Sequence, residues 1–240
     1  MAETSYELTV AEVRRETADA VSVVFDVPDQ HADAFGFAAG QFLTLAIPSD
    51  LTGVVARCYS VCVPPGEPLT VTVKRTSDGF ASVWIHDHLR VGDTLRVLPP
   101  SGIFTPKDWD ADLLLLAAGS GITPVMSILR TMLRDGTGRM AMLYANRDQE
   151  SVIFAEPLRE LAATHPDRLV VDHWLETERG LPTQAALHDF AAAYDTWEGF
   201  VCGPVPFMSA AAAALKDLGF PRSRRHLEKF VSLGGNPFDD

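Results

Sequence analysis

Apolar and polar positions follow one pattern in the first hundred residues of this chain and a different one after about residue 110. In the first part, short stretches rich in β-branched residues end at prolines or turn residues, and positions 69–74 alternate apolar and polar side chains, which is the period of a half-buried strand. This pattern predicts a closed antiparallel β-barrel with one short helix over 81–90. The strands expected in this part cover residues 21–27, 41–47, 69–74 and 94–98.

The second part alternates strands with helices. Residues 113–117 form a continuous apolar run, as expected of a strand buried on both faces of a parallel sheet. Segment 124–134 repeats apolar residues at helical spacing, with Thr123 as the expected N-cap and Pro124 at the first helical position. We therefore predict an α/β domain with a parallel sheet covered on both faces. Further strands are expected at 140–144, 169–173 and 198–202, and further helices at 157–163 and 210–215.

This change of pattern predicts two domains, 1–105 and 106–240, with a boundary near residues 102–110. The formal net charge of −12 excludes the basic face that nucleic acid binding needs. No apolar run approaches the ~20 residues that cross a bilayer, and the acidic N-terminus lacks the apolar core of a secretory signal. The three cysteines are too few for a disulfide framework, so a reducing cytoplasm is the expected location.

One candidate motif is Gly119-Ser120-Gly121-Ile122-Thr123-Pro124, which follows the first buried strand and opens a helix. Small residues let the backbone approach a ligand closely, and a helix N-terminus favours a phosphate. The third glycine of the dinucleotide fingerprint is absent, so a tight turn without a ligand is the alternative. A hydrolase nucleophile is excluded because the residues around Ser120 lack the G-x-S-x-G spacing.

A second candidate motif, Arg57-Cys58-Tyr59-Ser60, lies in the first part of the chain. An arginine can bind a phosphate, an aromatic ring can stack on a flat heterocycle, and a hydroxyl can donate to the polar edge of that heterocycle. The alternative interpretation is an ordinary strand edge. The tetrapeptide therefore indicates a ligand site only in combination with other segments.

Four segments in order resemble a known family: residues 57–60, residues 73–75 with 79–82, residues 119–124 and residues 202–204. Together they resemble the ferredoxin–NADP reductase superfamily over nearly the whole chain. Within it, the chain is most similar to flavin reductase components of bacterial multicomponent oxygenases, of the 3-ketosteroid 9α-hydroxylase and phenylacetyl-CoA oxygenase types. The tail segments 226–230 and 235–238 support that subgroup.

The resemblance implies an FAD site in the first domain. In the family, the arginine that matches Arg57 binds the FAD pyrophosphate, the tyrosine that matches Tyr59 packs on the isoalloxazine, and the serine that matches Ser60 hydrogen-bonds near flavin N5. The other implied residues run along the flavin or contact its pyrophosphate at a helix start: Val73, Lys74, Arg75, Gly79, Phe80, Ala81 and Ser82.

The resemblance also implies a site for NADH or NADPH in the second domain. Thr123 is expected beside both rings, Cys202 at the nicotinamide and Glu228 close to the flavin; with Ser60 these are the candidate catalytic residues. Asn146 and Arg147 follow a strand, where the adenosine ribose or its 2′-phosphate would lie, although a solvated arginine explains Arg147 equally well. The remaining dinucleotide-binding candidates are Gly119, Ser120, Gly121, Pro124, Gly203 and Pro204.

The function that the resemblance implies is electron transfer from NADH or NADPH, through FAD, to an iron–sulfur centre that serves an oxygenase. The chain contains no plant-type [2Fe–2S] cysteine pattern. We therefore expect the cluster on a missing C-terminal domain or on a separate ferredoxin partner, and we expect the chain to be a truncated piece of a longer reductase. The alternatives are a free-standing ferredoxin or flavodoxin reductase, and an interaction module that has lost its flavin.

Other polar residues have simpler interpretations. His86 and His88 are two positions apart, so on a helix they point to different faces, and we expect no metal site. The basic residues near the C-terminus are either a docking patch for an acidic electron carrier or a solvated surface. These residues are Arg222, Arg224, Arg225 and Lys229.

Overall fold

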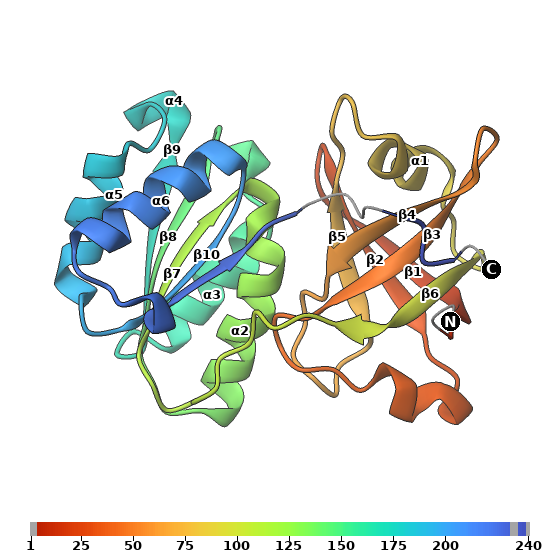
Figure 1. The fold of residues 1–240 in the computed structure, drawn as a ribbon, viewed down its shortest axis with the longest axis horizontal. Coiled ribbons are helices and arrows are strands. Elements are labelled where there is room, and N and C mark those ends of the chain that lie inside the picture. The colour runs from red at the N-terminus through yellow and green to blue at the C-terminus, as the bar shows by residue number, and fades with distance from the viewer. Residues whose placement is uncertain (1–3, 231–234, 239–240) are drawn as a thin grey trace. The chain divides into compact units, whose positions relative to one another are not determined.

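The structure is a computed structural model that describes residues 4–230 and 235–238. The chain divides into two compact units. The first contains the residues up to Thr105 together with the C-terminal segment 235–238, and the second is Pro106–Phe230. The first is built on an antiparallel sheet and the second on a parallel sheet with helices (Figure 1).

The first unit is an antiparallel barrel of six strands, which confirms the fold expected from the sequence. The strand order is β4-β3-β6-β1-β2-β5, and the two end strands meet because Val61, just beyond β4, bridges to Val71 in β5. The strands are β1 (Tyr6–Thr17), β2 (Ala20–Asp26), β3 (Phe42–Ser49), β4 (Gly53–Ser60), β5 (Thr70–Lys74) and β6 (Thr94–Ser101). A 3-10 segment, η1 (Asp29–Phe35), and one helix, α1 (Phe80–His88), complete the unit.

Strands β1 and β4 are absent from the sequence-based prediction. Strand β1 buries Leu8 and Val10 completely, but most of its other side chains are exposed and four of these are charged, so its apolar signal is weak. Strand β4 is only partly buried along most of its length. Both become strands because long neighbouring strands pair with them: β1 pairs with β2 and β6, and β4 pairs with β3.

The C-terminal segment packs on this barrel through Phe238. Its ring is 7% exposed and packs in one apolar cluster with Ala46, Ala56 and Leu98. The Arg96 guanidinium lies 5.1 Å from the ring centre and donates a hydrogen bond of 2.9 Å to the Phe238 carbonyl oxygen. A residue far along the chain from β6 is thus part of the first unit.

The second unit is a parallel sheet in the order β11-β10-β7-β8-β9. Every residue of β7 is buried, as the continuous apolar run predicted. The strands are β7 (Leu113–Ala118), β8 (Met140–Asn146), β9 (Leu169–Leu175), β10 (Glu198–Cys202) and β11 (Arg225–Glu228). The expected α/β fold is confirmed, although β11 is a further strand that the sequence pattern did not indicate.

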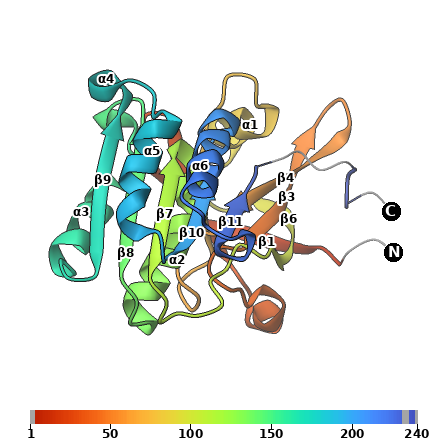
Figure 2. The ribbon, with the colours of Figure 1, turned by 60° about the vertical axis from the view of Figure 1, so that its left-hand side comes forward.

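Helices cover both faces of this sheet. Leu114 and Leu116 of β7 pack in one cluster with side chains of α5 and α6, which lie together over one face in Figure 2. Helices α2 and α3 contact the sheet from the other face. The helices are α2 (Ile122–Asp135), α3 (Ala155–Thr164), α4 (Glu176–Arg179), α5 (Gln184–Ala191) and α6 (Val205–Asp217). The 3-10 segments are η2 (Gly119–Gly121), η3 (Gln149–Ser151), η4 (Ala192–Tyr194) and η5 (Arg222–Arg224).

The strand order places a topological switch point at the carboxyl end of β7. The chain moves from β7 outward to β8 and β9, then returns to β10 on the other side of β7. In open α/β sheets, ligands bind outside the carboxyl ends of the strands at such a point. The segments that follow β7 and β10 are therefore where a ligand site is expected, and both carry predicted motifs.

The start of α2 differs from the prediction. The helix begins at Ile122, so Thr123 is not its N-cap and Pro124 is not its first residue. The reason is that the 3-10 turn η2 runs directly into the helix, with Gly121 already in helical conformation at φ −62° and ψ −11°. Pro124 is still tolerated because the first-turn N–H groups have no partner inside a helix.

Among the described residues, no helix combines the length and apolar character needed to cross a bilayer.

Candidate functional site

Two predicted motifs, far apart in sequence, touch at the carboxyl edge of the parallel sheet. A Cβ atom on Gly121 would fall 2.1 Å from the carbonyl oxygen of Cys202 and 2.7 Å from the amide nitrogen of Gly203. A Cβ on Gly203 would in turn fall 3.0 Å from that of Ala118. Side-chain atoms cannot fit at the first of these positions and are crowded at the second. The η2 turn therefore lies directly against the backbone that follows β10.

The same turn offers backbone groups suited to an anion. Gly119 has φ +52°, in the left-handed region that glycine adopts readily. The Thr123 hydroxyl donates a hydrogen bond of 3.0 Å to the Ser120 carbonyl oxygen, and no described side chain caps the start of α2. The first N–H groups of this helix thus remain a favourable site for a phosphate.

Asn146 ends β8 at the same edge of the sheet. Its side chain is 7% exposed, and its amide lies close enough to the Tyr144 hydroxyl to offset part of the rise in that hydroxyl's pKa, although among the described residues it makes no well-aligned hydrogen bond. Buried polar groups are usually paired, so an amide with only this weak contact at a switch point is available to bind a polar ligand. Arg147 follows on the surface, where its Nε donates to Asp148 Oδ2 at 3.0 Å. The Gly121 contact and this buried amide both fit a bound dinucleotide.

Cys202 and Glu228 lie opposite each other on neighbouring strands. Cys202, the last residue of β10, pairs with Glu228 of β11 on one side and with Ala117 of β7 on the other. Burial, and to a lesser degree the nearby Glu228 carboxylate, raises the pKa of the Cys202 thiol, so the thiol stays protonated. Burial also raises the pKa of Glu228 above its ordinary value.

In the first unit, the predicted flavin-binding side chains stand on β4. Ser60 is 3% exposed and pairs with Phe42 of β3, whereas Arg57 and Tyr59 are half-buried. Burial raises the pKa of the Tyr59 phenol, so the ring keeps its hydroxyl proton. The Arg57 Nη1 donates to the carbonyl oxygen of Ala56 at 2.8 Å.

The residues predicted to run along the flavin stand on β5, whose edge meets that of β4. Val73 is fully buried in the core, and its carbonyl oxygen lies 3.0 Å from His86 Nε2. The Lys74 ammonium lies 3.8 Å from an Asp19 carboxylate oxygen. Arg75 forms two hydrogen bonds with Asp87. These side chains already have protein partners, so this segment offers mainly its backbone to a ligand.

The predicted helix start in the first unit is present at α1. Gly79 precedes the helix, and a Cβ there would fall 2.0 Å from the Thr76 hydroxyl oxygen. The Ser82 hydroxyl donates to the Gly79 carbonyl oxygen at 2.9 Å and accepts from the Thr76 amide. Ala81 and Ser82 have buried side chains and Phe80 is 47% exposed. The turn is tight and internally bonded, which leaves the amides of the first turn of α1 and the Phe80 ring as the groups that a ligand can contact.

Sequence reasoning did not single out Tyr144, which lies beneath the η2 turn. Its side chain is fully buried in β8, and its hydroxyl donates a hydrogen bond of 3.1 Å to the Gly119 carbonyl oxygen. A tyrosine at the end of an apolar strand is a weak sequence signal, because tyrosines are common in protein cores.

Of the basic residues near the C-terminus, Arg224 has a structural role, because its guanidinium donates hydrogen bonds to the carbonyl oxygens of Asp195 and Trp197.

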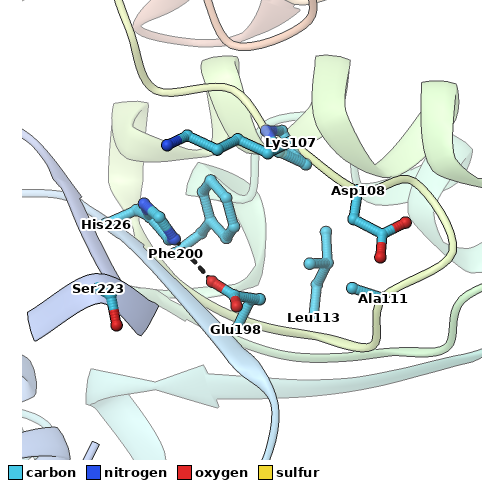
Figure 3. A pocket seen from close by; sticks show the side chains of 9 residues that line it. Lys107, Asp108, Ala111, Leu113, Glu198, Phe200, Ser223 and His226 are labelled. Atoms are coloured by element: carbon cyan, nitrogen blue, oxygen red, sulfur yellow. Dashed lines mark hydrogen bonds and ion pairs between the residues drawn. The ribbon is translucent and has the colours of Figure 1, made fainter. Parts of the chain in front are cut away.

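A separate pocket of about 170 Å³ lies near the opposite, amino-terminal edge of the parallel sheet (Figure 3). The His226 ring stacks on Phe200 with ring centres 4.4 Å apart, and its Nε2 donates to Glu198 Oε2 at 2.8 Å. Lys107 and Asp108 line the other side. None of the predicted cofactor-binding residues lines this pocket.

Comparisons with known protein families identify both units. Residues 7–105 match the model described as "Oxidoreductase FAD-binding domain", and residues 115–213 match the one described as "Oxidoreductase NAD-binding domain". The first match lies in the barrel unit. The second lies in the unit that carries the η2 turn.

Relatives of known description point the same way. The ferredoxin reductase component of 3-ketosteroid-9-alpha-monooxygenase from Rhodococcus rhodochrous is 56% identical over 235 residues, covering 97% of this chain and 67% of the relative. A component of the 1,2-phenylacetyl-CoA epoxidase of Escherichia coli is 36% identical over 251 residues, covering 96% of this chain and 69% of that protein.

A solved structure supports the same assignment. The Amycolatopsis cytochrome P450 reductase GcoB superposes with a TM-score of 0.77 at 28% identity, covering 95% of this chain and 71% of that one. The ferredoxin–NADP⁺ reductase of Plasmodium falciparum shares the fold, with a TM-score of 0.76 at 16% identity, covering 93% of this chain and 95% of that one. The chain therefore belongs to the family of FAD- and NAD-binding flavoprotein reductases that includes the ferredoxin reductase components of 3-ketosteroid-9-alpha-monooxygenases.

Proposed function

We propose that this NAD(P)H-dependent flavoprotein reductase passes electrons through FAD to an iron–sulfur protein or ferredoxin domain, as the reductase component of a multicomponent oxygenase. The observation that carries the proposal is the η2 turn seated against the backbone after β10, at the switch point of the NAD-binding domain. The relatives that are reductase components of monooxygenases support the acceptor class. We assign FAD binding to residues 1–105 and NAD(P)H binding to the domain predicted over residues 106–240, except for its C-terminal segment 235–238, which belongs to the first unit.

Bound FAD accepts a hydride from a nicotinamide and can release electrons one at a time, so the cofactor supplies the chemistry and the protein supplies binding and orientation. In the second domain, we assign the dinucleotide phosphates to the amides of the η2 turn and the first turn of α2. The buried Asn146 amide would bind a ribose hydroxyl. The backbone at Gly203 and Pro204 would border the nicotinamide. Orientation of two rings needs no acid, base or nucleophile from the protein.

In the first domain, side chains of β4 take the corresponding roles. We assign the FAD pyrophosphate to Arg57 and to the amides at the start of α1, because both offer positive charge or free N–H donors. The Tyr59 ring would lie against the isoalloxazine. Ser60 would donate its hydroxyl to the polar edge of the flavin, and its burial would keep that hydrogen bond away from water.

The protonation states and contacts of the candidate catalytic residues in the second domain limit the roles that these residues can have. These residues are Cys202, Thr123 and Glu228. The Cys202 thiol stays protonated, so we assign it a packing role in the site and no role as a thiolate nucleophile. The Thr123 hydroxyl is used inside the turn, so it contributes to the site by holding Ser120. The raised pKa of Glu228 allows its carboxyl group to keep a proton at a higher pH than an ordinary glutamate.

We further propose that the protein works in the cytoplasm and that its partners are a ferredoxin or iron–sulfur protein and an oxygenase. None of the three cysteines forms a disulfide, which is the usual state in a reducing compartment. The partner classes rest on the similarity to reductase components of oxygenases.

The proposal is tested on the full chain loaded with FAD. We expect a yellow protein that oxidises NADH or NADPH with ferricyanide as acceptor, and that reduces cytochrome c only when a [2Fe–2S] ferredoxin is added. Oxidation of the nucleotide with ferricyanide but without ferredoxin-dependent transfer would overturn the acceptor assignment. A colourless protein that takes up no FAD would overturn the whole proposal and favour the flavin-less module.

A further inference from the structure

Tyr144 occupies a position that the proposed mechanism does not use. Leu143 and Ala145 pack in the cluster with α5 and α6, so Tyr144, between them on the same strand, projects to the opposite face, which α2 and α3 cover. The side chain is fully buried. Burial raises the pKa of Tyr144 above its ordinary value, and the hydroxyl therefore keeps its proton.

The hydroxyl of Tyr144 has one proton, and the Gly119 carbonyl oxygen accepts it at 3.1 Å. The oxygen of the same hydroxyl is also in hydrogen-bonding contact with the Asn146 side chain and the Ile153 amide. The same carbonyl oxygen also accepts from the Ile122 amide at the end of η2. The two hydrogen bonds together fix the direction of the Gly119 carbonyl. Gly119 itself is in the left-handed conformation, where no side chain restrains the backbone.

A fixed carbonyl also fixes the amide of the next residue. A peptide group is planar and, when trans, its C=O and N–H bonds point in opposite directions. The structure contains no cis peptide bond among the described residues. Because the Gly119 carbonyl points toward Tyr144, the Ser120 N–H points away from it, on the other side of the turn.

We propose that Tyr144 is a positioning residue for the nicotinamide dinucleotide: by holding the Gly119 carbonyl it aims the Ser120 amide at the dinucleotide phosphates. This inference rests on the proposed function. It adds a residue that makes no contact with the ligand and acts through one peptide plane. Since the turn holds the dinucleotide before and during the reaction alike, the hydroxyl contributes to nucleotide affinity and leaves the hydride step unchanged.

The test compares Tyr144→Phe with wild type as the FAD-loaded full chain. The variant keeps the buried ring and removes the hydroxyl with its contacts to Gly119, Asn146 and Ile153, and the double variant described below isolates the part that acts through Gly119. We expect the KM for the preferred nucleotide to rise about two- to tenfold, the effect of one neutral hydrogen bond, with kcat and FAD content unchanged. The matched control is Tyr194→Phe in the same unit, whose ring packs 4.6 Å from that of Trp197 and which should leave KM unaltered.

A second variant tests directly whether the Tyr144 hydroxyl acts through Gly119. It also keeps the inference testable if the single variant folds poorly. Gly119→Ala strains the left-handed turn, so the Tyr144 hydroxyl loses its fixed acceptor, and adding Tyr144→Phe to it should raise KM by less than in wild type. An unchanged KM in Tyr144→Phe, or equal effects in both backgrounds, would overturn this inference alone. A wild-type chain that holds FAD but oxidises neither nucleotide would instead overturn the proposed function.

Discussion

The two units present their candidate cofactor groups in different ways. In the barrel, the groups assigned to FAD are mainly side chains of one strand: Arg57, Tyr59 and Ser60 on β4. In the parallel-sheet unit, the groups assigned to the nucleotide are mainly backbone amides of a turn that only glycine permits. A side-chain site is lost by removing atoms, whereas a backbone site is lost by adding them. The predictions below test this difference.

The largest effect is expected from adding one carbon to the backbone site. Gly121→Ala would place a Cβ 2.1 Å from the Cys202 carbonyl oxygen, so the turn and the end of β10 must separate. We expect nucleotide affinity to fall by about 3 kcal/mol, roughly 150-fold, with FAD content unchanged. Steady-state oxidation of NADH and NADPH, beside flavin content from the visible spectrum, measures both.

Gly36→Ala is the matched control for this variant. Its added Cβ would meet only the Asp33 carbonyl oxygen, at an ordinary 3.7 Å. If Gly121→Ala oxidises NADH with the wild-type KM, the turn is not the nucleotide site.

The next effect concerns the side-chain site. Arg57→Ala removes a charged donor, and a hydrogen bond to a charged group is worth about 1.5–3 kcal/mol. We expect FAD to dissociate more readily, while nucleotide binding by the second unit is retained, the reverse of the Gly121 variant. Equilibrium dialysis against free FAD measures the change. The control is Arg14→Ala, which removes an exposed arginine side chain of β1. Unchanged flavin retention would remove Arg57 from the assigned role.

A smaller effect is expected at the adenosine end of the nucleotide. Arg147 is exposed and already paired with Asp148, so its contribution is limited to about 1 kcal/mol, roughly fivefold. If Arg147 meets a 2′-phosphate, Arg147→Ala raises KM for NADPH by that factor more than for NADH. Arg139→Ala, an exposed arginine paired with Asp112 at the amino end of β8, is the control. Equal changes for both nucleotides would exclude the phosphate contact.

The smallest effect is a dependence of stability on pH. Glu228 has a raised pKa in the folded chain, so folding favours its protonated form. Its favourable contribution is therefore complete below the unfolded-state pKa of about 4.5 and is lost as pH rises through the folded-state value. Glu228→Gln should lose less stability than wild type over that rise, whereas Glu178→Gln on exposed α4 should follow wild type. Urea unfolding between pH 4 and 8 tests this, and parallel curves for all three proteins would contradict it.

Local patterns were sufficient to predict much of this fold. The apolar run of β7 and the helical spacing of α2 predicted a parallel α/β unit because both signals depend on burial alone. Strand β1 escaped prediction because its exposed face is highly charged. The start of α2 was misplaced because η2 supplies a turn that sequence does not distinguish from a capped helix.

The candidate site was less accessible from local patterns. The motif at residues 119–124 and that at 202–204 were both visible, but only the fold shows Gly121 against the Cys202 carbonyl oxygen. The partners of Arg75 and Ser82 depend on how α1 packs beside β5, which is a tertiary property. The sequence did not point to Tyr144, because its hydrogen-bond acceptor, the Gly119 carbonyl oxygen, lies in the turn after the neighbouring strand β7.

The most direct test of the account is anaerobic reduction of the FAD-loaded chain by a stoichiometric amount of NADH or NADPH. The account predicts that the visible flavin absorption bleaches with one of the two nucleotides in wild type, and that Gly121→Ala keeps its flavin but bleaches only with dithionite. A wild-type chain whose bound flavin is reduced by dithionite and by neither nucleotide would contradict it.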